Sequence, residues 1–462
     1  MTYTEMLINN IVNSKKESLP AEVIENTKIL ILDTLGCAIG GYCTTIGKKI
    51  VDQAKEFKSG EEASIFGSDN KVSLPFACWA NSTLANLLDM DDVYAGSAHQ
   101  ANCLVPTAIG VGETQNSSGL EVIHAIVLGF EVGSRIMMYS MPSQSKVRTY
   151  FPSTWQIFDA VTVAGKLFGF EQERLYDAFG LAGKVAVLPI NLQKSAEHNT
   201  GFSKGQFGWS TFSGVFWSLL AKKGVSSGIA HVFDGDAGFW ATMGSDYHNF
   251  EELNRDISEP YNILDTKFKP YPLCTWGHTS VDAVKDIFDE NTINTEDIEY
   301  INIKTIKRAI DLLSSPEKVE SIINAQFSLP HAVSMIALKK LPGHEWMSEE
   351  NIFHNREAEA VAKKVKLEVD PVAEKIFSEE KGLAIPSAVE VKTYDGRIFK
   401  KTVKYSKGTP QNPFTKQELK DKFKVLASTV FDEKQISAII ETVESLETVS
   451  NISILTKLLK GK

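Results

Sequence analysis

Apolar positions recur at helical spacing through the first half of the chain. From Pro20 onward the apolar residues fall three to four positions apart until the Gly40-Gly41 pair, which marks a helix end. The same spacing predicts further helices at about 77–90, 119–136, 155–168, 172–183 and 208–223. Several of these segments are apolar on most faces, so we expect them in the centre of a large helical bundle.

The pattern changes near residue 266. Pro270 and Pro272 interrupt the chain, and shorter elements of both kinds follow. We expect helices at 279–289 and 328–340, strands at 298–306 and 365–369, and a β-hairpin over 387–405 that turns at Asp395-Gly396. Residues 415–459 return to helical spacing.

This order of elements predicts a mainly α fold with an α+β insert. A chain of 462 residues is too long for one hydrophobic core. We therefore expect a large all-helical domain formed by both termini, residues 1–265 and 406–462, and a smaller α+β lid domain inserted at 266–405.

Composition and the N-terminal sequence limit the kinds of partner and the compartment that we expect for this protein. The net charge of -10 argues against nucleic acid or an anionic membrane surface, although a local cleft can still attract a small anion. The N-terminal stretch lacks the apolar core of a signal peptide, and no apolar run reaches the ~18 residues of a membrane span. The five cysteines form no CxxC pair, so we expect reduced thiols and a cytoplasmic location.

Two glycine-containing segments resemble known motifs but lack their context. GVSSG at 224–228 has the spacing of a hydrolase nucleophile elbow, which requires a strand before it. Here it follows a predicted helix, so Gly224 is better explained as a C-terminal cap. GVGETQ at 110–115 lacks the third glycine of a dinucleotide loop.

An acidic cluster with a nearby histidine is the strongest candidate for chemistry. Asp89, Asp91 and Asp92 come at the end of a predicted helix, and His99 follows ten residues after Asp89. Carboxylates at a helix C-terminus oppose the helix dipole, so three together suggest a purpose other than stability. Asp89 and Asp92 share a helix face if the helix continues that far. Catalysis, substrate binding, a solvated helix end and a divalent-metal site all remain open.

A lysine and a second histidine add to this candidate. Lys204 lies between two glycines just before a predicted helix, where an anion is favoured. His278 stands directly before the helix that Thr279 or Ser280 is expected to cap. The helix dipole there disfavours an imidazolium and leaves a neutral ring that can accept a proton. Solvated and packing roles are the ordinary alternatives for both residues.

These segments, taken in order, resemble the MmgE/PrpD family, which includes 2-methylcitrate dehydratase, cis-aconitate decarboxylase and iminodisuccinate epimerase. The resemblance covers nearly the whole chain. The similar segments are ILDTLGCAIGGY at 31–42, WANSTLANLLDMDD at 79–92, VPTAIGVGE at 105–113, GFEVGSRI at 129–136, FSKGQFGWSTFSG at 202–214, KPYPLCTWGH at 269–278, FSLPHAV at 327–333, TYDGR at 393–397 and GTPQNPFTKQELKDKF at 408–423.

The resemblance implies roles for eight residues. The catalytic positions that it implies are Asp89, His99, Lys204 and His278, and the substrate-binding positions are Lys204, Asp92, Ser203, His331 and Lys269. It also implies a helical domain from both termini with an inserted lid, a homodimer, a small anionic carboxylate as substrate, and no metal or organic cofactor.

The chain departs from the family's usual pattern at several positions. Val93 replaces a polar residue after the aspartate pair, and Gln100 replaces the proline after the first histidine. No histidine occurs in YFPSTWQIF at 150–158, and His331 stands where a tyrosine is common. These changes leave the proton-transfer groups in place and alter residues that shape the substrate pocket.

The expected function is a cofactor-independent lyase that moves a proton next to a carboxylate, foremost a dehydratase of a citrate-like hydroxy acid. One of His99 and His278 would move the proton and the other would act on the leaving group. Lys204 would anchor a carboxylate, and Asp89 would orient a histidine. The alternatives are an epimerase or isomerase, a decarboxylase, or a non-catalytic carboxylate-binding homologue.

Overall fold

The computed structural model describes residues 1–57, 59–95, 98–143, 154–186, 206–229, 231–257, 260–314 and 319–461. It is mainly helical with two small sheets, as the spacing of apolar residues predicts. Its first half contains α1 (Tyr3–Asn13), α2 (Ala21–Tyr42), α3 (Thr45–Glu56), β1 (Ala63–Ser64), β2 (Lys71–Val72), α4 (Leu74–Asn86), α5 (Ala101–Gln115), α6 (Gly119–Ser140), α7 (Gln156–Leu167), α8 (Gln172–Gly183), α10 (Phe207–Lys222), α11 (Phe239–Thr242) and α12 (Phe250–Asn254).

The second half alternates helices with strands and then returns to helix. Its elements are α13 (His278–Glu290), β3 (Ile298–Thr305), α14 (Lys307–Leu313), α15 (Ile322–Gln326), α16 (Leu329–Ala337), α17 (Arg356–Ala362), β4 (Val365–Val369), α18 (Pro371–Glu379), β5 (Ser387–Thr393), β6 (Ile398–Val403), α19 (Lys416–Ala427), α20 (Glu433–Glu444) and α21 (Ser453–Leu458). The predicted hairpin is confirmed, with Gly396 at the left-handed φ of 91° that its turn requires.

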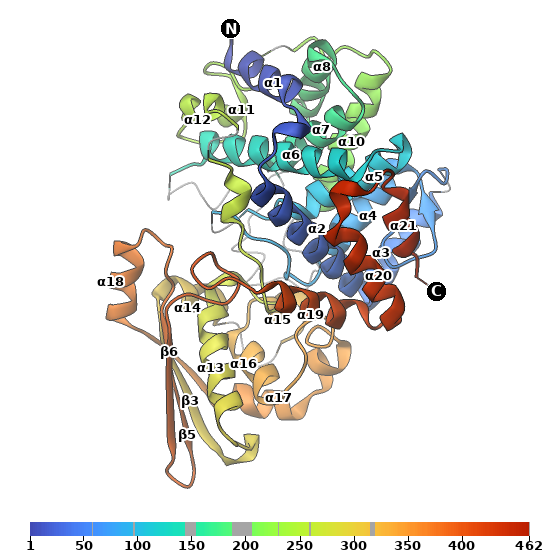
Figure 1. Ribbon diagram of the computed structural model, residues 1–462. Helices are drawn as coiled ribbons and strands as arrows, with labels where there is room; N and C mark the ends of the chain where they lie inside the picture. The colour runs from blue at the N-terminus through green and yellow to red at the C-terminus, as the bar shows by residue number, and fades with distance from the viewer. Residues whose placement is uncertain are drawn as a thin grey trace.

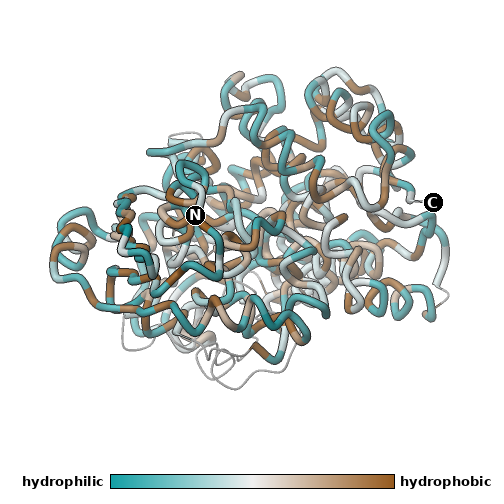
Figure 2. Tube along the Cα trace, turned by 90° about the horizontal axis from the view of Figure 1, so that it is seen from below, coloured by the Kyte–Doolittle hydropathy of each residue, from teal (hydrophilic) through white to brown (hydrophobic). Residues whose placement is uncertain are grey.

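The C-terminal helices pack back onto the first helices of the chain. Figure 1 shows α19, α20 and α21, in red, against the blue helices near the N-terminus, and α2 contacts both α19 and α20. One large hydrophobic cluster accordingly joins residues from Leu7 to Phe268 with residues from Leu419 to Leu459. In Figure 2 the outer helices alternate between hydrophilic and hydrophobic segments, as expected for helices that bury one face.

A four-stranded sheet organises the other part of the molecule. The strand order is β4-β3-β5-β6, in which β3 and β4 are parallel and the other neighbours are antiparallel. Helix α13 packs against β5 and β6, and α16 packs against α13 and α17 (Figure 1). The alternation of buried and half-buried residues along β5 matches a strand with one face on the core.

The second hydrophobic cluster includes the interior of this sheet and its helices. Most of its members lie between Tyr271 and Val391, but Cys37, Leu88, Met90 and Leu426 join it from the helical part. Leu88 and Met90 belong to the segment that carries the acidic residues, so this segment lies where the two clusters meet. The predicted domain boundaries at 265/266 and 405/406 stay a prediction.

Two helix ends differ from the prediction, and one predicted helix cap is confirmed. Helix α2 continues to Tyr42, and Gly41 serves close packing rather than a helix end, because a Cβ there would lie 2.2 Å from the Leu84 carbonyl oxygen. The predicted helix at 77–90 ends at Asn86. The Gly224 cap is confirmed, with φ of 84° directly after α10.

Helix α6 has the length and mean hydropathy of a membrane span, although Glu131 and Arg135 interrupt its apolar sequence. Of its most apolar window, 94% is buried inside the protein, as in the core helix of a bundle. It is the single straight helix with these properties among the residues that the structure describes.

Candidate active site

The acidic segment is a tight loop after α4 and does not continue the helix. Asp89 has a left-handed backbone with φ of 52°, and its N–H donates to the Asn86 carbonyl at 2.9 Å. The helix does not continue far enough for Asp89 and Asp92 to share one of its faces. A left-handed aspartate is uncommon and is held only where surrounding contacts fix it, which is typical of functional loops.

Asp89 forms a buried ion pair with Lys269. The Lys269 Nζ lies 2.7 Å from Asp89 Oδ1, and the two side chains are 2% and 0% exposed. Lys269 belongs to the proline-containing connector, which pairs with the loop through the backbones of Val93 and Lys267 at 2.8 and 2.9 Å. The structure thus brings together a predicted catalytic residue and a predicted substrate-binding residue that are far apart in the sequence.

The carboxylate beside His99 is that of Asp91. His99 Nδ1 lies 3.5 Å from Asp91 Oδ1, and both side chains are buried. Asp91 also accepts hydrogen bonds from the amides of Asn86 and Asn102 at 2.8–3.0 Å. Gln156 donates to the His99 carbonyl from α7. Asp91 is therefore a carboxylate placed beside the His99 ring, and the expectation that Asp89 orients a histidine stays a prediction.

His278 is the first residue of α13, and its ring is a neutral base. Its Nε2 lies 2.8 Å from the Leu273 carbonyl, which can only accept, so Nε2 carries the proton and Nδ1 keeps a lone pair. Burial and the nearby Lys269 lower the pKa of His278 to about 3, while Asp89 opposes this shift. The prediction of a neutral ring is thus confirmed, although desolvation is its main cause.

The capping prediction at this helix is wrong. The N-cap of α13 is Gly277, which provides no side-chain hydrogen bond. Thr279 and Ser280 instead contact the Ser387 hydroxyl at 2.9 Å, which ties α13 to β5. The sequence did not reveal this because the hydroxyls have a partner that is more than a hundred residues away.

Asp92 and His331 are buried and already engaged by the protein. The two Asp92 oxygens accept the backbone N–H groups of Gln100 and Ala101 at 3.1 and 3.0 Å, which holds the start of α5. His331 Nε2 faces the Trp346 carbonyl at 3.3 Å, and burial lowers the pKa of His331 to about 4. Their predicted contacts with substrate stay predictions.

The remaining predicted positions divide into two groups. Lys204 and Ser203 lie outside the described residues. Val93 and Gln100, which differ from the family pattern, are buried: Val93 pairs with the connector, and the Gln100 amide fits between the Phe130 carbonyl and the Ser134 N–H at 3.1 Å each. Both residues therefore have packing roles in this chain.

Asp89, Asp91 and His99 also have the spacing of a metal site. Their ligand atoms lie within 4.8 Å of one another, and all three residues are buried. Carboxylate oxygens and imidazole nitrogens are suitable ligands for several divalent ions. The Lys269 ammonium already supplies a positive charge to Asp89, so a metal ion would have to compete with it.

Sequence reasoning missed a second buried pair at the same loop. Lys422 of α19 lies 2.6 Å from Asp33 of α2 and donates to the Met90 carbonyl at 2.8 Å. A signal was present in the sequence: Lys422 shares one face of α19 with the buried residues Leu419, Phe423 and Leu426. A lysine on an apolar helix face requires a partner.

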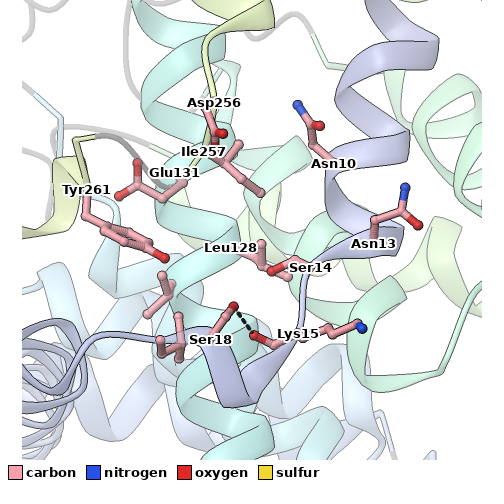
Figure 3. Close-up of a pocket in the computed structure, with 12 residues that line it drawn as sticks. Asn10, Asn13, Ser14, Lys15, Ser18, Leu128, Glu131, Asp256, Ile257 and Tyr261 are labelled. Carbon is pink, nitrogen blue, oxygen red and sulfur yellow. Dashed lines mark hydrogen bonds between the residues drawn. The ribbon is translucent and has the colours of Figure 1, made fainter.

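Another cavity lies away from this site. Figure 3 shows it between α1, α6 and the segment around Tyr261, with a volume of about 290 Å³. Its lining includes Glu131, whose carboxylate is bound by Arg135 at 2.7 Å and by the Ile263 N–H at 3.0 Å. Among the predicted site residues that the structure describes, none lines this cavity.

Two family models match most of the chain. The MmgE/PrpD N-terminal domain matches residues 5–251, and the MmgE/PrpD C-terminal domain matches residues 271–448. The chain belongs to the MmgE/PrpD family. This family includes lyases that act on small carboxylates.

Relatives of known activity align over almost the full length of this MmgE/PrpD protein. The chain is similar to cis-aconitate decarboxylase of Mus musculus, with 23% identity over 99% of this chain and 93% of the relative. It is similar to the Homo sapiens enzyme, with 24% identity over 99% and 94%, and to the Aspergillus terreus enzyme, with 24% identity over 97% and 94%.

Proposed function

We propose that this protein is a lyase that moves a proton next to a carboxylate of a small di- or tricarboxylate, in the first instance a dehydratase of a citrate-like hydroxy acid. The observation that carries the proposal is the neutral His278 beside the buried Asp89–Lys269 pair. A proton acceptor next to a buried cation suits the removal of a C–H proton adjacent to a carboxylate, because the cation offsets the negative charge that develops.

The dehydration step follows from these roles. His278 Nδ1 takes the proton from the carbon next to a carboxylate, and the C–H electron pair forms a double bond. The C–O bond on the neighbouring carbon breaks, and His99 protonates the departing oxygen so that water leaves. Asp91 holds the His99 ring for this task. Lys204 anchors a second carboxylate, as the resemblance implies.

Decarboxylation is the second candidate, and the names of the relatives favour it. Loss of CO₂ leaves the electron pair of the broken C–C bond on carbon, which then requires a proton. This reaction needs an acid more than a base, so His99 rather than His278 would be the essential group. At about 23% identity, relatives with a shared scaffold can differ in this outcome.

A single NMR experiment in deuterated water separates these reactions. The purified protein is incubated with citrate, 2-methylcitrate, cis-aconitate and an amino dicarboxylate. Loss of water from a hydroxy acid supports the dehydratase, and release of CO₂ from cis-aconitate supports the decarboxylase. Deuterium exchange without either loss would indicate an epimerase. Binding without any turnover across the panel would overturn the proposal of a catalyst.

A further inference from the structure

The loop that carries Asp89 and Asp91 is held by three distant parts of the chain. Gln326 of α15 donates to the Leu87 carbonyl at 2.8 Å. The connector pairs with Val93 through its backbone, and Lys422 donates to the Met90 carbonyl at 2.8 Å. Met90 stands between the two aspartates, so Lys422 fixes the peptide that joins them.

Lys422 is buried among titratable groups from the elements around it. Asp33 and Cys37 of α2 and Asp91 of the loop act on its charge, and its own charge reaches His278 of α13, where Lys269 of the connector acts as well. Burial disfavours the ammonium, but Asp33, Cys37 and Asp91 together outweigh burial and raise the pKa of Lys422. A fixed positive charge therefore lies behind the loop at neutral pH.

We propose that Lys422 is a positioning residue of the active site, which holds the Asp89–Asp91 loop in its left-handed conformation from the C-terminal helix α19. Asp33 keeps Lys422 charged and directed at the Met90 carbonyl. Without this contact the Met90 carbonyl, in the peptide between Met90 and Asp91, loses its donor, and the neighbouring Asp89 can leave the conformation in which it meets Lys269. The role in turnover rests on the proposed function, whereas the role in loop geometry does not.

The chain contains a closely matched control. Lys28 is also a buried lysine between α2 and the C-terminal helices, and it too combines a carbonyl with carboxylate partners: it donates to the Glu444 carbonyl at 2.8 Å and pairs with Glu447 at 3.1 Å and with Glu25 at 2.5 Å. None of these partners belongs to the acidic loop. K28M therefore removes a similar interaction from the same interface and leaves the site intact.

The test compares K422M, K422R and K28M with the wild-type protein. On the substrate that the wild type turns over, we expect K422M to lower kcat by at least about tenfold, because small displacements of catalytic groups have large effects on rate. K422R retains the charge and should recover part of kcat, and K28M should stay within about twofold of wild type. The acid limb of kcat/KM should move to higher pH in K422M alone, since Lys422 is one of the cations near His278.

Crystal structures of K422M and K28M give a readout that does not depend on turnover. We expect a changed backbone at Asp89 in K422M and an unchanged loop in K28M. An unaltered loop together with wild-type kcat in K422M would overturn the proposal, as would an equal loss of kcat in K28M. If the methionine variant does not fold, K422Q replaces it. An inactive wild type refutes the proposed function, and the loop structures still decide the role of Lys422.

Discussion

Two buried clusters of charge in this protein are built in opposite ways. Glu131 and Arg135 lie four residues apart on α6, and their ion pair measures 2.7 Å. The Arg135 guanidinium also donates to the carbonyls of Glu131, Arg255 and Asp256. This cluster is nearly complete within one helix and the segment beside it, which is typical of a structural pair.

The cluster around Asp89 draws on segments from the whole chain. Lys269, His278 and Lys422 reach the acidic loop from the connector, α13 and α19. It combines ion pairs with a neutral imidazole. Groups that converge in this way are costly to bury and are expected where a reaction needs them. We therefore expect that removing a charge from Glu131–Arg135 mainly lowers the free energy of unfolding. Removing a charge from Asp89–Lys269 should mainly lower kcat.

Replacement of His278 should have the largest effect on rate. H278Q keeps an amide that can donate to the Leu273 carbonyl but removes the proton acceptor, so we expect kcat to fall by about 10²–10⁴-fold. Steady-state kinetics measure this loss. H124Q changes another buried histidine with a lowered pKa, on α6, and should leave kcat unchanged. Wild-type turnover by H278Q would remove His278 from the mechanism.

The two cations of the compared clusters should respond differently. K269M should lower kcat by about 10²–10³-fold, the effect of removing one preorganised charge from a site. R135M should leave kcat of the folded protein unchanged and lower the free energy of unfolding by about 3–5 kcal/mol, because Glu131 stays buried without its counter-charge. Urea unfolding and kinetics on both variants measure the two quantities. Equal losses of kcat in K269M and R135M would show that the two ion pairs do not differ in this way.

Acid should destabilise the fold through its buried histidines. Burial, with Lys166 and Lys16, lowers the pKa of His124 to about 4 from its ordinary 6.5. Below about pH 6.5 His124 is therefore protonated in the unfolded chain but stays neutral in the folded protein. The free energy of unfolding falls as the pH drops from there toward 4. Urea unfolding at pH 7 and pH 5 should show this loss, and H124Q should reduce it by roughly 1–2 kcal/mol. An unchanged pH dependence in H124Q would contradict this account.

Removal of divalent metal should have the smallest effect. Lys269 already neutralises Asp89 in the Asp89, Asp91 and His99 group, so dialysis against EDTA should change kcat by less than about twofold. Activity that disappears with EDTA and returns with one divalent ion would show that a metal replaces the lysine as the partner of Asp89.

Much of the fold could be predicted because local spacing determines it. The hairpin at 387–405 and the helices at 119–136 and 172–183 have strong periodicity and clear ends, and all of them occur in the structure. Helix α5 was missed, since Pro106 and several glycines weaken its pattern. Asp92 compensates for this weak pattern, because its carboxylate accepts two backbone N–H groups at the start of α5.

The site was predicted less completely because its contacts are long-range. The structure brings Asp89, His99 and His278 into one region, while their roles stay predictions, and Lys269 entered only through the family resemblance. The partnership of Asp91 with His99 and that of Asp33 with Lys422 depend on how helices cross, which spacing does not reveal. A charged residue on an apolar helix face is the signal that could have found Lys422.

The place of Lys422 near the end of the chain has a consequence for biosynthesis. Ribosomes deliver residues from the N-terminus at about 5–20 per second, and domains fold as their sequences emerge. The acidic loop, the connector and α13 all emerge before α19, so a nascent chain can build most of the helical layers while the loop still lacks one of its anchors. If Lys422 acts as we propose, catalytic competence is among the last properties that the growing polypeptide acquires, and premature termination before α19 yields a protein whose acidic loop lacks this anchor.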